Sequence, residues 1–294
     1  MRTVFLKGAC ALLSLLAPTI SAAASDAGAF SVEKYGDQGK PIVFIPGLAS
    51  GTWTWKADAQ RLAKSHVVYL LALPGFDGRP ARPGTTFQSL QADLESFIEH
   101  EHLRKPVLVG HSLGGTLSLA FAADHSDLIA GVIAVDGLPV LPGTENMADR
   151  AALAQGARAQ IENQTPEQFA QYQQTYMARV GVIDPARAKT LAEWSGRSDP
   201  RAVAELAAQT LQLDLRPRLK SITVPVTEIS PFYEQDFAAM GVDEAGKTNY
   251  YRMLLTGIEK LDVVSISPAR HFVMFDQPEK FAAALDQALA KFAH

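Results

Sequence analysis

The sequence predicts an α/β fold with a mostly parallel central sheet, helices on its faces and an all-helical cap inserted between two strands. Short apolar runs alternate along the chain with segments of helical periodicity, which is the pattern of successive βαβ units. The alternation stops between about residues 138 and 219, where the sequence is rich in Ala, Gln and Glu and indicates helices only. With 294 residues, of which 47% are hydrophobic, the chain is long enough for one large domain that carries such an insertion.

The predicted strands are short apolar segments. Residues 30–35 are expected to add an antiparallel strand at one edge of the sheet. The runs expected to form the parallel part of the sheet are residues 41–45, 66–71, 106–109, 131–135, 224–229 and 261–266.

Helical segments fall between these runs. Residues 87–100 carry apolar side chains at helical spacing, residues 117–123 follow the third parallel run, and residues 278–292 close the chain. Pro278 followed by Glu279 is a typical helix start, because proline fits the first helical turn and a carboxylate there interacts favourably with the helix dipole.

The insertion at about residues 138–219 contains two further helix starts. Thr165-Pro166-Glu167 and Ser198-Asp199-Pro200 each place a capping side chain before a proline at the first helical position. We interpret this all-helical excursion as a lid or cap on a single main domain, which is expected to span residues 25–294.

Residues 1–24 are predicted to be a secretory signal peptide. Arg2 and Lys7 supply a basic start, and residues 8–20 form an apolar run too short to span a bilayer comfortably. Ala22-Ala23-Ala24 offers the small residues that precede a cleavage site, which we place after the last of them. The protein is therefore expected to be exported, either to the periplasm or to the medium.

Composition excludes several classes of partner and cofactor. Cys10, the one cysteine, lies in the predicted signal peptide, so the mature chain is expected to have neither a disulfide nor a thiol nucleophile. The formal net charge is −4 and there is no Lys/Arg run, so we expect no nucleic-acid or anionic-lipid partner. No apolar stretch in the mature chain reaches membrane-spanning length. Because no metal cluster, phosphate loop or dinucleotide fingerprint occurs, no metal and no cofactor are expected.

Gly110-His111-Ser112-Leu113-Gly114 is the motif that predicts chemistry. It follows a predicted strand and precedes a predicted helix, which is typical of a sharp turn that holds a serine in strained geometry with its Oγ exposed. The flanking glycines are needed because a Cβ would clash with neighbouring backbone in so tight a turn. The helix N-terminus behind Ser112 also favours developing negative charge. We therefore predict that Ser112 is a nucleophile.

With this motif, the chain resembles the α/β-hydrolase superfamily over nearly all of its mature length. Four segments carry the resemblance: Ile45-Pro46-Gly47-Leu48, Leu73-Pro74-Gly75-Phe76, the Gly-His-Ser-Leu-Gly-Gly run, and Ala269-Arg270-His271-Phe272 before a Gln-Pro-Glu helix start. The family's usual His-Gly after its third strand is Pro46-Gly47 here. The resemblance implies the fold, a catalytic triad and activity as a serine hydrolase.

His271 is the expected general base. It lies just after the last predicted strand, and the order serine, acid, histidine along the chain is that of this fold. A serine hydroxyl is a poor nucleophile until a base such as imidazole takes its proton. His111, inside the turn motif, is expected to pack rather than react.

The sequence leaves the acid open between two strands. The superfamily commonly places it after the strand at residues 224–229, where Glu234 falls near the expected position and Asp236 lies close by. This chain lacks the turn glycine that usually accompanies the acid there. A minority of the superfamily uses a residue one strand earlier, and Asp136 occupies that place, at the carboxyl end of a predicted strand. We favour Asp136 and keep Glu234 as the alternative.

The resemblance also implies an oxyanion hole made of the backbone N–H groups of Leu48 and Leu113. Aromatic side chains are candidates for the walls of the substrate pocket, with ordinary packing as the competing interpretation. The candidates are Trp53, Trp55, Tyr172, Tyr176, Phe232 and Phe272. Tyr172 and Tyr176 belong to a stripe at helical spacing by which the cap is expected to pack on the main domain.

Together these residues predict the hydrolysis of a small ester or similar acyl compound through an acyl-enzyme on Ser112. An ester is the default because esterase activity is the commonest on this fold, which is an argument from analogy. The same triad also serves an acyltransferase, lactonase, amidase or C–C hydrolase. A binding protein without catalysis is the alternative from a different class.

Overall fold

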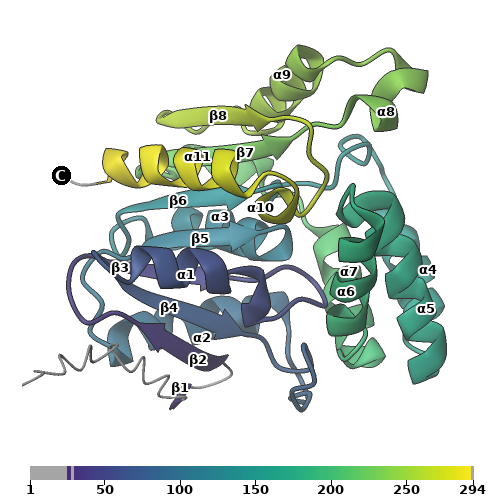
Figure 1. Ribbon diagram of the computed structural model, residues 1–294, viewed down its shortest axis with the longest axis horizontal. Coiled ribbons are helices and arrows are strands. Elements are labelled where there is room, and N and C mark those ends of the chain that lie inside the picture. The colour runs from purple at the N-terminus through teal and green to yellow at the C-terminus, as the bar shows by residue number, and fades with distance from the viewer. Residues whose placement is uncertain (1–24, 28–29, 293–294) are drawn as a thin grey trace, which may run out of the picture.

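The computed structural model describes residues 25–27 and 30–292, so the predicted signal peptide, with Cys10, lies outside the described residues. The described chain forms one eight-stranded sheet in the order β1-β2-β4-β3-β5-β6-β7-β8 (Figure 1). The strands are β1 (Ser25–Ala27), β2 (Phe30–Tyr35), β3 (Pro41–Ile45), β4 (Val67–Ala72), β5 (Val107–His111), β6 (Gly131–Val135), β7 (Val226–Pro231) and β8 (Leu261–Ile266). The strands from β4 to β8 in this order run parallel, which confirms the predicted fold class.

One detail of the sheet differs from the prediction. β2 is antiparallel to β4, as expected, but it is not the edge strand, because β1 pairs with its other side. The three residues of β1 are too few to show the alternation or apolar run by which a strand is recognised from sequence.

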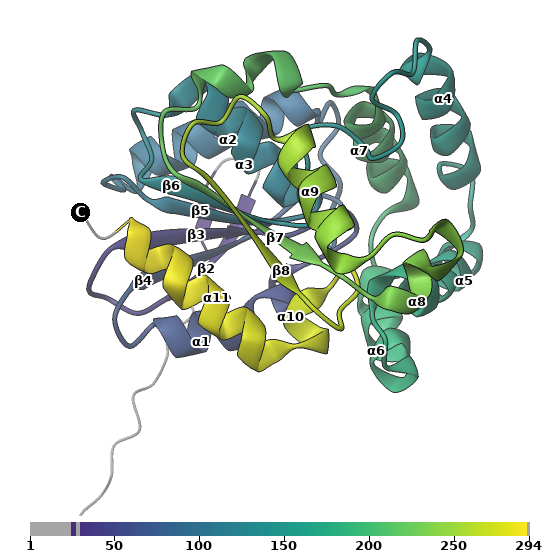
Figure 2. The ribbon, with the colours of Figure 1, turned by 90° about the horizontal axis from the view of Figure 1, so that it is seen from above.

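Helices cover both faces of the sheet. Those of the main domain are α1 (Lys56–Leu62), α2 (Phe87–His100), α3 (Leu113–His125), α8 (Glu234–Phe237), α9 (Glu244–Leu254), α10 (Val273–Asp276) and α11 (Pro278–Lys291), with short turns η1 (Thr52–Thr54) and η4 (Ala238–Met240). Figure 2 shows α2 and α3 on one face and α1, α10 and α11 on the other. No helix among the described residues combines the length and apolarity that a membrane crossing requires.

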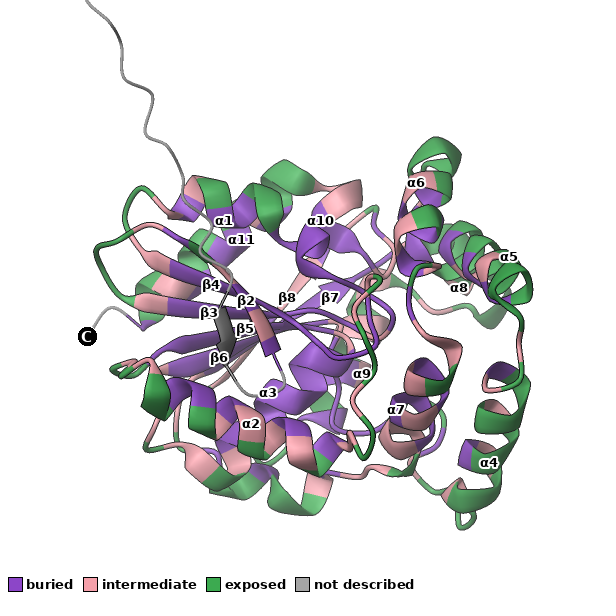
Figure 3. Ribbon diagram, turned by 90° about the horizontal axis from the view of Figure 1, so that it is seen from below, coloured by how far each residue is buried: buried purple, intermediate pink, exposed green. Residues whose placement is uncertain are grey.

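Because both faces are covered, the central strands are apolar on both sides and contribute to two cores. In β3, Ile42 and Phe44 pack with Trp55 and the α11 side, whereas Val43 and Ile45 pack with the α2 and α3 side. Figure 3 shows the resulting buried centre, with the exposed residues confined to the outer helices and loops.

A second group of helices lies between β6 and β7 in sequence and stands beyond the carboxyl ends of the parallel strands (Figure 1). It consists of α4 (Arg150–Ile161), α5 (Pro166–Tyr176), the π-helical η2 (Met177–Gly181), α6 (Pro185–Ser195), α7 (Pro200–Gln212) and η3 (Arg216–Ser221). Both predicted helix starts are confirmed. Thr165 caps α5 in a capping box with Gln168, and Asp199 caps α7 ahead of Pro200.

The first part of this segment is not helical, in contrast to the prediction. The chain after β6 runs as a loop until α4 begins at Arg150. Pro139, Pro142 and Gly143 explain the difference, since proline cannot donate a helical hydrogen bond and Gly143 has a left-handed φ of 84°. This loop forms part of the site.

Candidate active site

The turn between β5 and α3 presents Ser112 at the carboxyl end of the sheet. Ser112 has a φ of 51°, in the left-handed region that non-glycine residues rarely adopt. Its backbone N–H donates to the carbonyl of Val135 at 2.9 Å, so the neighbouring strand β6 fixes the turn. A Cβ on Gly110 would collide with the carbonyl of Gly114, and one on Gly114 with the carbonyl of Ile45. The two glycines are therefore required by the close approach of backbone to backbone.

Asp136 and His271 meet beside this turn. Asp136 is the first residue after β6, and its backbone N–H donates to the carbonyl of Ile229 at 3.0 Å. His271 Nδ1 donates to Asp136 Oδ2 at 2.6 Å, across 135 positions of sequence. A carboxylate that accepts from Nδ1 leaves Nε2 of the imidazole as the basic nitrogen.

The other candidate carboxylates do not contact His271. Glu234 is exposed at the start of α8, and its carboxylate makes no hydrogen bond with any described residue. Asp236 accepts two hydrogen bonds from Arg270, at 2.7 and 2.8 Å. Of the acids proposed from the sequence, the structure brings only Asp136 to the histidine.

Helix α9 supplies two residues that hold Asp136. Tyr251 donates its hydroxyl to Asp136 Oδ1 at 2.5 Å, so both carboxylate oxygens are occupied. Burial raises the pKa of Asp136. The hydrogen bonds from His271 and Tyr251 and the charge of Lys247 outweigh this effect, so that the pKa lies well below its usual range. The carboxyl group is therefore ionised at neutral pH and can orient an imidazole and stabilise its charged form.

Sequence reasoning missed Lys247 and Tyr251, because α9 itself was not predicted. A signal was present in Asp243, whose side chain accepts from Gly246 N–H and caps the helix ahead of Glu244. Lys247 and Tyr251 are four residues apart and so lie on one face of α9. The four-residue spacing alone does not indicate that this face of α9 meets Asp136, the carboxylate that follows β6.

A second buried carboxyl group, Glu228 of β7, lies behind Asp136. Its side chain is fully buried, Oε1 accepts from the Gly137 N–H at 3.3 Å, and Oε2 has no partner among the described residues. Burial, and then the negative charge of Asp136, raise the pKa of Glu228 well above its usual value. The neutral acid therefore sits beside the ionised one, in keeping with the cost of two adjacent buried charges.

Replacing Glu228 with Gln should make the protein relatively more stable as the pH rises. Because the folded-state pKa of Glu228 is raised, the wild-type group stabilises the fold fully only below its unfolded pKa, and this contribution falls as the pH rises toward the folded value. Glutamine stays neutral throughout. Urea unfolding at pH 5 and pH 8 should show that the difference in unfolding free energy, variant minus wild type, is larger at pH 8. A difference that does not change with pH would contradict this.

His111 packs beneath the site, as predicted. Its Nε2 donates to the backbone carbonyl of His271 at 3.0 Å, and its ring centroid is 4.4 Å from that of His271. Complete burial, and then the charge of His271, hold the pKa of His111 well below its usual value. His111 therefore stays neutral and anchors the loop that carries His271.

Ser112 and His271 together line two cavities. The main cavity, of about 370 Å³, has Val140 and Leu141 of the loop after β6 in its walls. The side cavity, of about 110 Å³, lies against Leu48. Tyr176 lines both cavities, so it stands where they meet beside Ser112.

The backbone amides expected to form an oxyanion hole flank Ser112. Leu113 lines the main cavity and Leu48 the side cavity, and Ser112 lines both. Neither amide donates a hydrogen bond to any described residue. A Cβ on Gly47 would lie 3.2 Å from that of Ser112, so the Leu48 turn passes directly beside the serine. Both donors are free to bind an oxygen at this point.

The aromatic candidates divide into two groups. Tyr172, Tyr176 and Phe272 line the side cavity. Trp53, Trp55 and Phe232 are buried and line neither cavity. Trp53 packs on Trp194 and Phe272, Trp55 on Phe44 and Phe281, and Phe232 on Phe237. These three residues lie near the site motifs in sequence, but that proximity did not determine whether their side chains point into the cavities.

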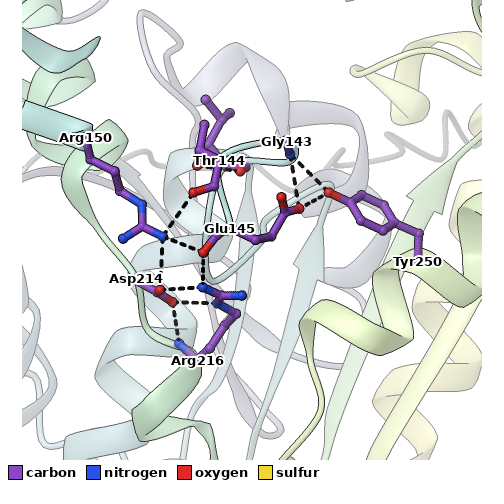
Figure 4. Close-up of polar contacts among 8 residues, drawn as sticks. Gly143, Thr144, Glu145, Arg150, Asp214, Arg216 and Tyr250 are labelled. Atoms are coloured by element: carbon purple, nitrogen blue, oxygen red, sulfur yellow. Dashed lines mark hydrogen bonds and ion pairs between the residues drawn. The ribbon is translucent and has the colours of Figure 1, made fainter. Parts of the chain in front are cut away.

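Polar contacts on two sides hold the loop whose apolar residues wall the main cavity (Figure 4). On one side, Tyr250 of α9 donates to the Glu145 carboxylate, which also accepts from the Gly143 N–H at 3.1 Å. On the other, Arg150 and Arg216 both bind Asp214, and Arg216 also donates to the Glu145 carbonyl at 2.6 Å. The cavity wall is therefore tied to both α9 and the cap helices.

Comparisons with known proteins show the family and the fold. Residues 42–284 match the family model described as the alpha/beta hydrolase family. The abhydrolase domain-containing protein lid-1 of Caenorhabditis elegans is 35% identical over 104 residues, which cover 33% of this chain and 29% of that protein. The chain thus spans less than a third of that relative. The pimeloyl-(acyl-carrier protein) methyl ester esterase of Vibrio cholerae is 26% identical, over 65% of this chain and 75% of that protein.

Solved structures show the same fold. A thermophilic esterase from Thermogutta terrifontis superposes with a TM-score of 0.75 at 21% identity, covering 90% of this chain and 95% of that one.

Proposed function

Because the chain belongs to the alpha/beta hydrolase family, we propose that it is a serine hydrolase that cleaves a small carboxylic ester through an acyl-enzyme on Ser112. One observation carries the proposal. Ser112 and His271 line the same two cavities, and Nδ1 of His271 donates to a partly buried, ionised Asp136 at 2.6 Å. This is the set of groups that nucleophilic attack on a carbonyl requires.

In the first half-reaction, Nε2 of His271 removes the proton from Ser112 as its Oγ attacks the ester carbonyl. The oxyanion that forms accepts hydrogen bonds from the Leu48 and Leu113 amides, which donate to no other described residue. His271 then gives its proton to the departing alkoxide oxygen, so the alcohol leaves and an acyl-serine remains.

In the second half-reaction, His271 takes a proton from water, which attacks the acyl-serine carbonyl and releases the acid. Asp136 stays ionised in both halves, because the Tyr251 hydroxyl and the Lys247 charge stabilise its negative form. Its role is to fix the imidazole tautomer and to stabilise the imidazolium that forms twice in each cycle.

Covalent labelling by a fluorophosphonate tests the nucleophile. The wild-type protein should be labelled on one serine, and Ser112→Ala should abolish both the labelling and the hydrolysis of p-nitrophenyl esters. Ser65→Ala, a change at an exposed serine remote from the turn, is the matched control and should label normally. An unlabelled wild-type protein would refute the proposal.

Product analysis separates hydrolysis from its neighbouring reactions. A series of p-nitrophenyl esters of increasing acyl length, with water, alcohol and amine as competing acceptors, should release the free acid as the main product. A dominant alcohol or amine adduct would assign the site to acyl transfer instead.

We also propose that the protein is exported, on the basis of residues 1–24. Expression of the full chain followed by N-terminal sequencing should give a mature protein that begins at Ser25 and is recovered outside the cytoplasm. A full-length cytoplasmic product would contradict this.

A further inference from the structure

A third hollow adjoins the site and differs from the other two in its charge. This cleft, of about 520 Å³, shares Asp136, Val180 and His271 with the main cavity but does not reach Ser112. Its lining includes Arg179, Lys247 and Arg270. We call it the arginine cleft.

Two of its three cations are already neutralised by the protein. Arg270 makes a two-pronged ion pair with Asp236 and lies 4.9 Å over the ring of Tyr233. Lys247 is directed at the Pro231 carbonyl and compensates the charge of Asp136. The Arg179 guanidinium makes no ion pair or hydrogen bond with any described residue. The cleft therefore has one uncompensated positive charge.

The acids near the cleft do not cancel this charge. Asp136 is bound by His271 and Tyr251, and Asp236 by Arg270. The raised pKa of Glu228 keeps that residue neutral behind the site. Glu145 is not among the residues that line the cleft. With three cations and two carboxylates in its lining, the cleft has a formal charge of +1, which favours an anion.

The backbone beneath Arg179 is held rigidly against the candidate base. Arg179 belongs to the π-helical η2, a conformation that is rare and often found at functional sites. The His271 N–H donates to the Val180 carbonyl at 3.2 Å, and the Phe272 N–H to the Gly181 carbonyl at 2.9 Å. The Arg270 guanidinium adds a bond to the Ala178 carbonyl at 2.9 Å. These bonds fix the position of the Arg179 backbone relative to His271 while its guanidinium stays unpaired.

We propose that the arginine cleft binds a carboxylate carried by the substrate, with Arg179 as its ligand, while the scissile carbonyl lies at Ser112. The inference deepens the proposed function and rests on it. A planar guanidinium with free N–H groups matches a carboxylate in two-pronged geometry. The shared lining of the cleft and the main cavity allows one small molecule to reach both. The substrate class is thus a monoester of a dicarboxylic acid or an ester of a carboxylated alcohol.

Paired substrates test this assignment. In the first pair, mono-4-nitrophenyl glutarate is compared with its neutral carboxamide analogue, so the carboxylate lies on the acyl side of the ester. In the second pair, 4-acetoxybenzoate is compared with 4-acetoxybenzamide, so the carboxylate lies on the alcohol side. Wild-type protein should prefer the carboxylate member of one pair in kcat/KM. In Arg179→Gln that preference should fall about tenfold, through KM rather than kcat, and Arg179→Lys should restore part of it. Arg201→Gln should keep the full preference, because Arg201 is exposed, lies outside the cavities described and has a guanidinium without a partner among the described residues.

A binding measurement decides the matter without chemistry. The carboxylate esters are titrated calorimetrically into Ser112→Ala and into the Ser112→Ala/Arg179→Gln double variant. The Kd of the preferred ester should rise about tenfold in the double variant. Three outcomes would overturn the proposal: the two proteins bind the ester equally, neither binds it, or the Arg179→Gln enzyme keeps the wild-type preference. Failure of Ser112 to react with a fluorophosphonate would instead refute the proposed hydrolysis, and the titration would still report on the cleft.

Discussion

Replacing Asp136 with Asn should lower kcat by about 10³- to 10⁴-fold while leaving the fold intact. Asparagine has nearly the same shape, but it removes the negative charge that His271 Nδ1 contacts at 2.6 Å. Its amide either repels the Nδ1–H or favours the opposite imidazole tautomer, in which Nε2 has a proton and is unable to accept one from Ser112. The imidazolium formed during the reaction also loses its stabilising charge.

Glu234→Gln is the matched control, because Glu234 is the other acid that the sequence allows and is exposed at the start of α8. It should change kcat by less than about twofold, since substitutions of exposed groups outside the chemistry have small effects. Initial rates on a p-nitrophenyl ester, with circular dichroism to verify folding, compare the two variants. A large loss in Glu234→Gln together with an active Asp136→Asn would transfer the role of the acid to Glu234.

Gly114→Ala should destabilise the protein by about 3 kcal/mol or more and abolish Ser112 labelling. The added methyl group meets the backbone carbonyls of Ile45 and Pro46, and backbone, unlike a flexible side chain, has no rotamer by which to move aside. Relief requires α3 to move away from β3. That movement separates the Leu113 amide from the Leu48 amide and so also disrupts the oxyanion site.

The control for this substitution is Gly156→Ala, in the interior of α4. A Cβ at Gly156 meets nothing within 4 Å, and alanine is the better helix former, so this variant should match or exceed the wild-type stability by up to about 1 kcal/mol. Urea unfolding and fluorophosphonate labelling measure both variants. A Gly114→Ala protein of normal stability that labels at the wild-type rate would show that the turn tolerates a side chain.

The strands of the sheet were predictable because their signal is local. The boundaries expected for residues 41–45, 131–135 and 261–266 are those of β3, β6 and β8. A strand buried on both faces must be apolar along its whole length, and this is visible in the sequence itself. The sharp turn at Ser112 was predictable for the same reason, since it depends on glycines two positions away on either side. Caps such as Thr165 also act over three residues.

Other features depend on contacts between distant parts of the chain. Asp136 follows β6 and Glu234 follows β7, and the packing of these two strand ends beside the end of β8 decides which acid meets His271. Tyr251 and Lys247 reach Asp136 because α9 packs against β7 and β8, which no local pattern indicates. Packing also decides which way the Trp53 side chain points. It likewise leaves the Arg179 guanidinium without an ion-pair partner among the described residues.

The sequence by itself therefore determined the parallel strands, the helix starts at Thr165 and Asp199 and the serine turn, because short-range sterics and hydrogen bonding suffice for them. Only the tertiary structure decided the partner of His271, the residues that hold Asp136, the aromatic walls and the charge of the arginine cleft. These features depend on which side chains the fold brings together from distant parts of the chain. Asp136 and His271, for example, are 135 residues apart in sequence.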